Sequence, residues 1–232
     1  MPKFNITKET SPEKTFRVSG VLSAFDLDIN KVKEQFEGNI DIEDKEWNIG
    51  LIVGNSGSGK STIAKEVFSE SYIFEYDYKA ISVIDDMPKE KSIKDITKAF
   101  TSVGFASPPS WLKPYSVLSN GEKMRCDLAR AILEEKELIV FDEFTSVINR
   151  EVAKTGSFAI QKAIRKLNKK FIAVACHSDI IEWLQPDWIY NTDEQRFFFA
   201  KANTNDPQLN LKFSEIKTTE QRFGNHLKSI II

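Results

Sequence analysis

The segment from Gly54 to Ser61 constrains this chain more than any other part of its sequence. It reads Gly-Asn-Ser-Gly-Ser-Gly-Lys-Ser and follows an apolar run at residues 49–53. In residues 62–68, four apolar residues fall on one face of a helix, namely Ile63, Ala64, Val67 and Phe68. The sequence therefore predicts a strand, a glycine-rich loop and a helix, which is the context of a phosphate-binding loop.

Each residue type in this loop has a physical role. The glycines let consecutive backbone N–H groups curl around a phosphate, which also lies at the positive end of the following helix. Lys60 can reach the β- and γ-phosphates, and the Ser61 hydroxyl can bind Mg²⁺. The alternative is a surface loop that matches by chance, which the flanking strand and helix disfavour. The predicted nucleotide-binding residues are Gly54, Asn55, Ser56, Gly57, Ser58, Gly59, Lys60, Ser61 and Thr62.

Composition limits the class of protein. A chain of 232 residues fits one large α/β domain or two small ones. The formal charge of -2 gives no bulk attraction to nucleic acid. The two cysteines, Cys126 and Cys176, lie in apolar segments, which favours a reducing compartment over a disulfide framework. We find no leader-like or membrane-spanning apolar run and expect a cytoplasmic protein without direct membrane insertion.

The remaining pattern predicts an α/β fold with a mainly parallel sheet. Residues 14–53, including 15–18 and 39–42, alternate as antiparallel strands do. Residues 122–136 predict a helix, and the apolar runs 138–141 and 171–175 predict buried parallel strands. Further predicted elements are a buried strand at 80–84 that ends at Asp85 and Asp86, a hairpin at 188–199 and a strand at 208–216.

Two acids end the apolar run at residues 138–141. Asp142 at the tip of this strand can hold the Mg²⁺ water shell opposite Ser61. Glu143 can polarise the water that attacks the γ-phosphate. A strand that ends in two acids is a weak signal alone, but here it follows Lys60 by 82 residues.

The next motif identifies a resemblance to a family. Residues 118–125, Leu-Ser-Asn-Gly-Glu-Lys-Met-Arg, and the helix after them resemble the signature motif of ATP-binding cassette (ABC) ATPases. Ser119 and Glu122 are also spaced as an ordinary capping box, and both interpretations can hold together. Residues 142–149 resemble the acid motif and D-loop of that family, and residues 174–179 resemble its switch-histidine segment, with His177 as the histidine. A lone histidine after a strand is more often structural, but the order of the motifs favours the family role.

The resemblance implies a P-loop fold of the ABC type that binds and hydrolyses ATP with Mg²⁺. It implies Lys60, Glu143 and His177 as catalytic residues, and Ser61 and Asp142 as metal-binding residues. In the family two domains pair head to tail, so Ser119, Asn120 and Gly121 of one subunit clamp the ATP of the other. A ring that stacks on adenine is expected upstream of the loop. Phe25 is the first candidate and Phe36 the second, with core burial as the alternative for both.

The sequence departs from the family pattern at four places. Asn120 replaces a signature glycine, Glu122 replaces the usual glutamine, and Asn149 replaces the D-loop acid. The glutamine expected after the strand that follows the first helix is missing, and Asp85 and Asp86 stand there. Asp86 is therefore a candidate for the Mg²⁺ shell, with a strand-end turn as the alternative.

The sequence also bears on the biological task. We expect an ATPase domain at residues 1–204 with a short helical insert at about 87–118, and a C-terminal extension or linker at 205–232. The short insert favours a soluble, non-transport ATPase dimer over a transporter motor subunit or a nucleotide sensor that hydrolyses poorly. The tail resembles the linker of soluble ABC ATPases associated with a predicted acetyltransferase, which suggests an effector protein as partner. A basic stretch at 150–170 is a solvated face or, less favoured, a nucleic-acid surface.

Overall fold

A seven-stranded sheet forms the centre of the computed structural model, which describes residues 3–10, 13, 15–26, 32–73, 75–134, 136–201 and 212–215. Its strands lie in the order β4-β5-β6-β3-β7-β8-β9. Strands β4 to β7 are parallel, and β8 and β9 pair antiparallel. The strands are β3 (Ile49–Val53), β4 (Tyr72–Ile73), β5 (Leu138–Phe141), β6 (Lys170–Ala175), β7 (Trp188–Asn191), β8 (Arg196–Lys201) and β9 (Lys212–Glu215). The predicted mainly parallel α/β fold is confirmed.

Burial explains why the central strands read as continuous apolar runs. Every residue of β3 is buried, and so is all of β6 except Lys170. A strand that is covered on both faces has no solvent-exposed side, so polar and apolar residues do not alternate along it. The register pairs Val53 of β3 with Ala175 of β6, and Phe141 of β5 with Ala173 of β6. The carboxyl ends of β3, β5 and β6 therefore meet at one edge of the sheet.

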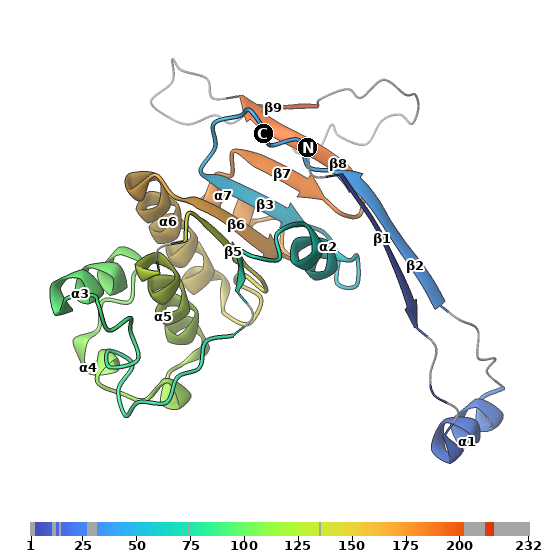
Figure 1. Cartoon of the computed structure of the whole chain (residues 1–232), viewed down its shortest axis with the longest axis horizontal. Helices are drawn as coiled ribbons and strands as arrows, with labels where there is room; N and C mark the ends of the chain where they lie inside the picture. The colour runs from blue at the N-terminus through green and yellow to red at the C-terminus, as the bar shows by residue number, and fades with distance from the viewer. Residues whose placement is uncertain are drawn as a thin grey trace.

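Helices cover both faces of the sheet. On one face Leu51 lies in a core that includes residues of α5 and α6, and on the other Ile52 lies in a second core that includes Ile63 of α2. Figure 1 shows α5 and α6 on one side of the sheet and α2 with the β1–β2 hairpin on the other. These helices are α2 (Lys60–Val67), α5 (Asn120–Leu133), α6 (Arg150–Leu167) and α7 (Ile180–Leu184). The predicted helix and strands in this region are confirmed, as is the β7–β8 hairpin.

The N-terminal segment forms an antiparallel pair separate from the main sheet. Strands β1 (Lys3–Thr10) and β2 (Val32–Asn39) pair along their whole length, and helix α1 (Phe16–Ala24) lies between them in sequence. The predicted strand at residues 15–18 is wrong, because the Thr15 hydroxyl accepts the Val18 N–H at 3.2 Å and caps a helix start. Of the predicted strand at 39–42, only Asn39 is in a strand.

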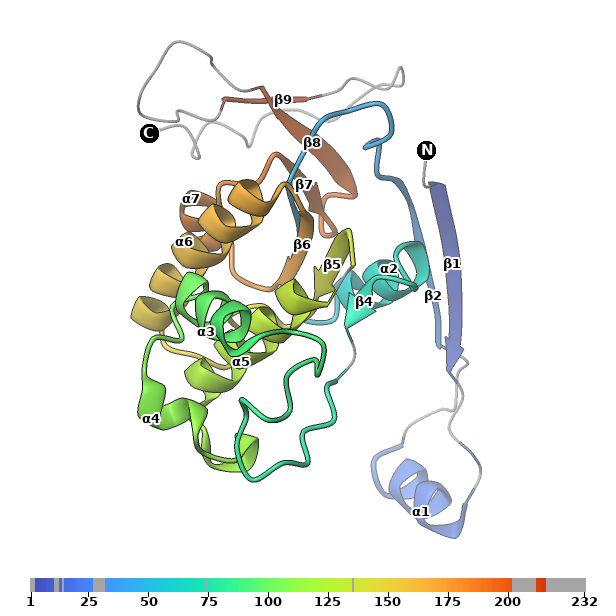
Figure 2. The same cartoon turned by 60° about the vertical axis from the view of Figure 1, so that its left-hand side comes forward.

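The insert between β4 and α5 carries three short helical elements: α3 (Ile93–Ser102), α4 (Pro108–Trp111) and the 3₁₀ turn η1 (Tyr115–Val117). Phe100 anchors this region, because its ring packs 5.1 Å from the Phe105 ring and 5.4 Å from the Trp111 ring, measured between centroids. Figure 2 shows α3 and α4 beside α5, away from the β1–β2 hairpin.

The predicted buried strand at residues 80–84 is wrong. The segment is a series of bends and turns, in which Asp85 N–H donates to the Ser82 carbonyl at 3.1 Å. Val83 is fully buried, and the segment pairs with a later part of the insert, where the Val83 N–H donates to the Lys113 carbonyl at 2.9 Å. The parallel strand that follows α2 is instead β4, only four residues after Phe68.

The C-terminal part is described only in places. Of the predicted strand at 208–216, residues Lys212–Glu215 form β9, which pairs with β8. The rest of the predicted extension at 205–232 lies outside the described residues. Among the helices that the structure describes, none is both long and apolar enough to cross a membrane.

Candidate functional site

The phosphate loop lies between β3 and α2, as its sequence predicts. Gly57 and Gly59 have φ angles of +83° and +85°, a left-handed conformation that side-chain-bearing residues rarely adopt. Lys60 opens α2 and is only 9% exposed, and its Nζ donates to the Asn55 carbonyl at 2.5 Å. The lysine ammonium thus lies across the loop, while Ser61 follows it in the first turn of α2. This arrangement places a cation and a helix N-terminus together.

The turn between β7 and β8 anchors the loop from the opposite side. The Ser58 and Thr192 hydroxyls hydrogen-bond at 2.6 Å, and the Asn55 N–H donates to both Asp193 carboxylate oxygens at 2.9 and 3.1 Å. A Cβ at Gly54 would lie 2.1 Å from Thr192 Oγ1, so only glycine fits there. The sequence did not predict a role for Thr192 and Asp193, because no local pattern in a hairpin turn indicates contact with the phosphate loop.

The two acids and the histidine follow neighbouring parallel strands. Asp142 and Glu143 come directly after β5, and His177 comes two residues after β6 and is exposed. Because the ends of β3, β5 and β6 share an edge, these residues lie at the same edge as the phosphate loop. Glu143 has a φ of +52°, which is uncommon for a residue with a side chain and indicates local strain.

Both oxygens of the Asp142 carboxylate accept hydrogen bonds. Oδ1 accepts the Glu143 N–H at 2.8 Å, and Oδ2 accepts the Tyr72 hydroxyl. Burial raises the pKa of Tyr72 above its ordinary value, and the hydrogen bond to Asp142 raises it further. Tyr72 therefore stays a hydrogen-bond donor, and the orientation of the Asp142 carboxylate is fixed.

A cavity of about 650 Å³ lies beside these acids. Among the described residues it is lined by Asp142 and Glu143, by Glu75 after β4, and by Asn120 and Lys123 of α5. Glu75 follows the parallel strand after α2, which is the position that the sequence had assigned to Asp85 and Asp86. The run Ser71-Tyr72-Ile73-Phe74 before Glu75 was the available signal for this strand.

The structure places the predicted metal candidate Asp86 in a different role. Its carboxylate accepts the Lys79 N–H at 3.1 Å and the Ala80 N–H at 3.0 and 3.1 Å. These bonds close a turn in its own loop, and Asp86 does not line the cavity beside Asp142. Asp86 is therefore better described as a turn residue, which was the alternative, than as a ligand in the Mg²⁺ shell.

The segment that resembles the signature motif starts α5 with a complete capping box. The Ser119 hydroxyl accepts the Glu122 N–H at 3.4 Å, and Glu122 Oε2 accepts the Ser119 N–H at 2.9 Å. Hydrogen bonds from the Ser110 hydroxyl, and next from Ser119, lower the pKa of Glu122 to about 2. Asn120 donates to the Val147 carbonyl at 3.4 Å. The side chains of Asn120 and Glu122 therefore hydrogen-bond within the protein at the start of α5.

Gly121 is the tightest position in this segment. A Cβ there would lie 2.8 Å from Cγ1 of Val152, at the start of α6. Asn149, which replaces the D-loop acid, is the N-cap of α6, and its side chain accepts the Val152 N–H at 2.9 Å. The N-termini of α5 and α6 therefore pack together through small or capping residues.

The structure reverses the order of the two aromatic candidates. Phe25 is 72% exposed at the end of α1, which lies beyond the far end of the β1–β2 hairpin from the main sheet (Figure 1). The Phe36 ring lies against the loop instead, because a Cβ at Gly59 would be 2.2 Å from it. Thr62 is also held from the hairpin, since Lys8 Nζ donates to its hydroxyl at 2.6 Å.

A half-buried acid joins the insert to α5. Asp127 accepts the Tyr78 hydroxyl at 2.8 Å and the Tyr115 hydroxyl at 2.7 Å, and the two rings stack with centroids 4.0 Å apart. Arg130 lies over the Tyr78 ring at 4.9 Å. Burial raises the pKa of Asp127 to about 6, although the two tyrosine hydrogen bonds oppose this.

The raised pKa of Asp127 predicts a pH-dependent stability. In the unfolded chain this acid titrates near its ordinary value of 3.8, so between pH 4 and pH 6 the folded state binds more protons and loses stability as pH rises. Relative to the parent, Asp127→Asn should gain stability from pH 4 to pH 7 by up to about 3 kcal/mol. Urea unfolding of both proteins across this pH range checks this. A stability difference that stays constant with pH would contradict it.

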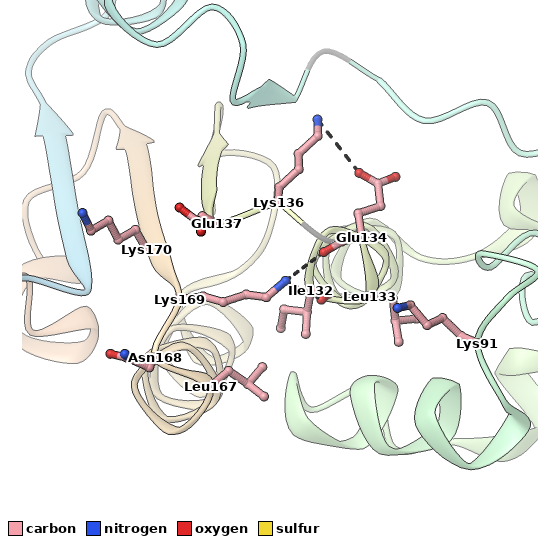
Figure 3. Close-up of a pocket in the computed structure, with 10 residues that line it drawn as sticks. All are labelled: Lys91, Ile132, Leu133, Glu134, Lys136, Glu137, Leu167, Asn168, Lys169 and Lys170. Atoms are coloured by element: carbon pink, nitrogen blue, oxygen red, sulfur yellow. Dashed lines mark hydrogen bonds and ion pairs between the residues drawn. The ribbon is translucent and has the colours of Figure 1, made fainter.

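A second hollow, of about 620 Å³, lies at the opposite edge of the sheet, where β5 and β6 begin (Figure 3). Lys169 crosses it and donates to the Ile132 and Glu134 carbonyls at 2.9 and 2.8 Å, which closes the C-terminus of α5. Arg165 of the predicted basic stretch similarly binds Asp187 at 3.0 Å. Arg150, at the start of the same stretch, binds Asp179 at 2.8 Å, and Lys170 Nζ lies 5.2 Å from the centre of the Trp47 ring, whereas Lys154, Lys162 and Lys166 are exposed.

Comparison with known proteins places this geometry in a family. A family model described as the NB-ARC domain matches residues 26–158, more than half of the chain, and the chain belongs to the P-loop family that this model represents. Two solved structures have the same fold with a TM-score of 0.58 and 14% sequence identity, over 82% of this chain and 92% of theirs. They are the dimeric MJ0796, a bacterial ABC transporter cassette, and MJ0796 in a post-hydrolysis state bound to ADP and Pi.

Curated relatives agree with the solved structures. An uncharacterized ABC transporter ATP-binding protein of Haemophilus influenzae is 30% identical over 48% of this chain and 57% of its own length. The methionine import ATP-binding protein MetN of Clostridium tetani is 26% identical over 62% of this chain and 58% of its own. This chain has the fold of an ABC-type ATPase cassette. It spans about 60% of the length of these curated relatives.

The two family descriptions differ in extent. The NB-ARC match ends at residue 158, so it contains the phosphate loop and the acid-ended strand but not His177. The cassette structures cover 82% of the chain. The ABC cassette fold therefore accounts for more of the domain than the NB-ARC match does.

Proposed function

We propose that this cassette hydrolyses ATP with Mg²⁺ and does so as a homodimer that assembles around the nucleotide. The observation that carries the proposal is the position of Lys60, Asp142 and Glu143 at one edge of a parallel sheet. Ligands of P-loop and other parallel α/β folds bind at this edge, where glycine-rich loops and helix N-termini converge.

The residues present fit a bound Mg²⁺ ion. Among the described residues, no three histidine, cysteine or acidic side chains gather into a metal cage. Mg²⁺ needs no such cage, because it usually takes one or two protein ligands and completes its shell with water and substrate phosphates. Ser61 and Asp142 would supply those protein ligands. The ion, when bound, neutralises charge that develops on the phosphate oxygens.

The chain's own residues divide the work of hydrolysis. The N–H groups of residues 57–62 and the Lys60 ammonium bind the phosphates and hold the γ-phosphate in place. Glu143 orients the attacking water and accepts its proton. His177, exposed at the end of β6, contacts the γ-phosphate side of the site when the nucleotide is bound. Phe36, rather than Phe25, is the better candidate for the adenine side, because it adjoins Gly59.

The dimer completes the site with Ser119, Asn120 and Gly121 of the second subunit. A capped helix N-terminus presents N–H groups and a positive dipole end, both of which attract the γ-phosphate. None of the loop residues 54–61 lines the described cavity beside Asn120. This supports a clamp that acts on the nucleotide of a partner rather than on that of its own subunit.

For the biological task we favour a soluble, cytoplasmic ATPase that couples closure of the dimer to a partner protein or nucleic acid. The short insert between β4 and α5 supports this proposal. The second candidate is a transporter motor subunit, favoured by the names of the curated relatives. Pull-down from the native cell distinguishes the two candidates. If a membrane permease is recovered in stoichiometric amounts, the proposal of a soluble ATPase is wrong. The effector suggested for the tail rests on residues outside those described.

Assembly around ATP is testable with a variant that binds but does not hydrolyse. We expect Glu143→Gln to sediment as a monomer without nucleotide and as a dimer with ATP and Mg²⁺, because the ATP supplies the contacts between subunits. A monomer under both conditions would contradict the proposed dimer. A dimer of equal strength without ATP would show that assembly does not depend on the nucleotide.

A further inference from the structure

Tyr72 is buried between the helix of the phosphate loop and the strand of the acids. It lies in β4, where it pairs with Val140 of β5, two residues before Asp142. Its side chain is 6% exposed and belongs to the core that includes Ile63 and Ala64 of α2. Lys65 of α2 places its Nζ 5.2 Å from the centre of the Tyr72 ring. One side chain therefore contacts both elements that carry the site.

The hydroxyl of Tyr72 has a specific partner. It donates to Asp142 Oδ2, while the Glu143 N–H donates to Oδ1 at 2.8 Å. The two bonds fix the plane of the carboxylate and leave each oxygen a further lone pair. A phenylalanine would fill the same apolar space, so packing alone does not require a hydroxyl at this buried position.

We propose that Tyr72 is a positioning residue that orients the Asp142 carboxylate toward the metal of the nucleotide complex. Protein groups that hydrogen-bond to metal-binding carboxylates fix their orientation and commonly change metal affinity 10- to 100-fold. Tyr72 performs this role from the strand next to β5, and its ring also rests on α2, which begins with Lys60 and Ser61. Neither the phosphate-loop nor the acid motif contains this residue. The inference rests on the proposed ATP and Mg²⁺ site.

The test is the metal affinity of Tyr72→Phe, measured apart from turnover. Mn²⁺ serves as the probe: its binding to the ADP complex is followed by electron paramagnetic resonance, and binding of fluorescent ADP is measured in EDTA. We expect Mn²⁺ affinity to fall about 10- to 100-fold while metal-free ADP affinity stays unchanged. Tyr190→Phe is the matched control, because Tyr190 is also buried and its hydroxyl lies 3.5 Å from the Glu37 carbonyl, away from the acids.

A double-mutant cycle separates positioning from general stability. In an Asp142→Asn background, Tyr72→Phe should produce almost no further loss of Mn²⁺ affinity, because the oriented carboxylate is already gone. A Tyr72→Phe protein that melts at a lower temperature but binds Mn²⁺ like the parent would overturn the inference. A parent that binds neither ADP nor Mn²⁺–ADP would instead overturn the proposed function, so the two failures are distinguishable.

Discussion

Replacement of Glu143 by Gln should lower the rate of ATP hydrolysis by about a hundredfold or more while ATP still binds. Glutamine keeps the size of the side chain but cannot accept the proton of the attacking water, and general bases commonly contribute 10²- to 10⁴-fold. The lysine and loop that bind the phosphates are unchanged, so the nucleotide Kd should stay close to that of the parent. Phosphate release under saturating ATP and equilibrium binding of ATP measure the two quantities.

Glu151→Gln is the matched control for this change. Glu151 is an exposed residue in the first turn of α6, so the same substitution there should leave hydrolysis unchanged. If Glu143→Gln hydrolyses ATP at the parent rate, the base lies elsewhere. Glu75 would then be the first residue to test, because it lines the same cavity as Glu143.

Lys60→Ala should weaken ATP binding about 10- to 150-fold. Hydrogen bonds to charged groups contribute about 1.5 to 3 kcal/mol, and the phosphates would lose their main counter-charge. The lysine is buried and its Nζ already lies against the Asn55 carbonyl, so little reorganisation is needed for it to contact a phosphate. Isothermal titration calorimetry with ATP gives the Kd of the variant and of the parent.

An exposed lysine controls for the loss of positive charge. Lys162→Ala on α6 removes the same charge from a solvated position and should leave the Kd within about twofold of the parent, because exposed charges are screened. If ATP binding is weakened equally in both variants, the effect comes from the loss of net positive charge and not from a contact between Lys60 and the phosphates. Unchanged ATP affinity in Lys60→Ala would contradict the assignment of the phosphate loop.

Local patterns predicted the elements that hold the site. The loop at Gly54–Ser61, the buried strands β5 and β6 and the capped helix α5 each carry their signal within a few consecutive residues. Continuous apolar runs and a capping box are such short-range signals, so these elements could be identified without the fold. The order of the motifs then predicted the ABC cassette fold.

The errors arose where distant contacts decide the structure. Residues 80–84 have the composition of a buried strand, but Val83 is buried within the insert and hydrogen-bonds to Lys113 in a segment of turns. Among the described residues β4 has two in a strand, and the sequence pattern does not predict it. The acid expected after this strand was therefore assigned to Asp86 instead of Glu75. Strand length and periodicity carry little information in segments this short.

The missed residues share one property, which is that their partners are far away in sequence. Tyr72 contacts Asp142 across 70 residues, and Asp193 contacts Asn55 across 138 residues. A tyrosine in a strand and an aspartate in a turn are ordinary in a sequence. Their relation to the site becomes visible only when the sheet brings β4 beside β5 and the β7–β8 turn beside the phosphate loop.

Mixing two inactive variants tests most directly whether the site is shared between subunits. Lys60→Ala removes the phosphate loop's cation, and Ser119→Glu places a negative charge where the clamp would meet the γ-phosphate. Each variant alone should be inactive, and loss of one N-cap should cost only about 1 kcal/mol of stability. A mixed dimer has one site with an intact loop and an intact clamp, so ATP hydrolysis should reappear on mixing. A mixture no more active than the average of the two separate variants would contradict the head-to-tail ATPase dimer.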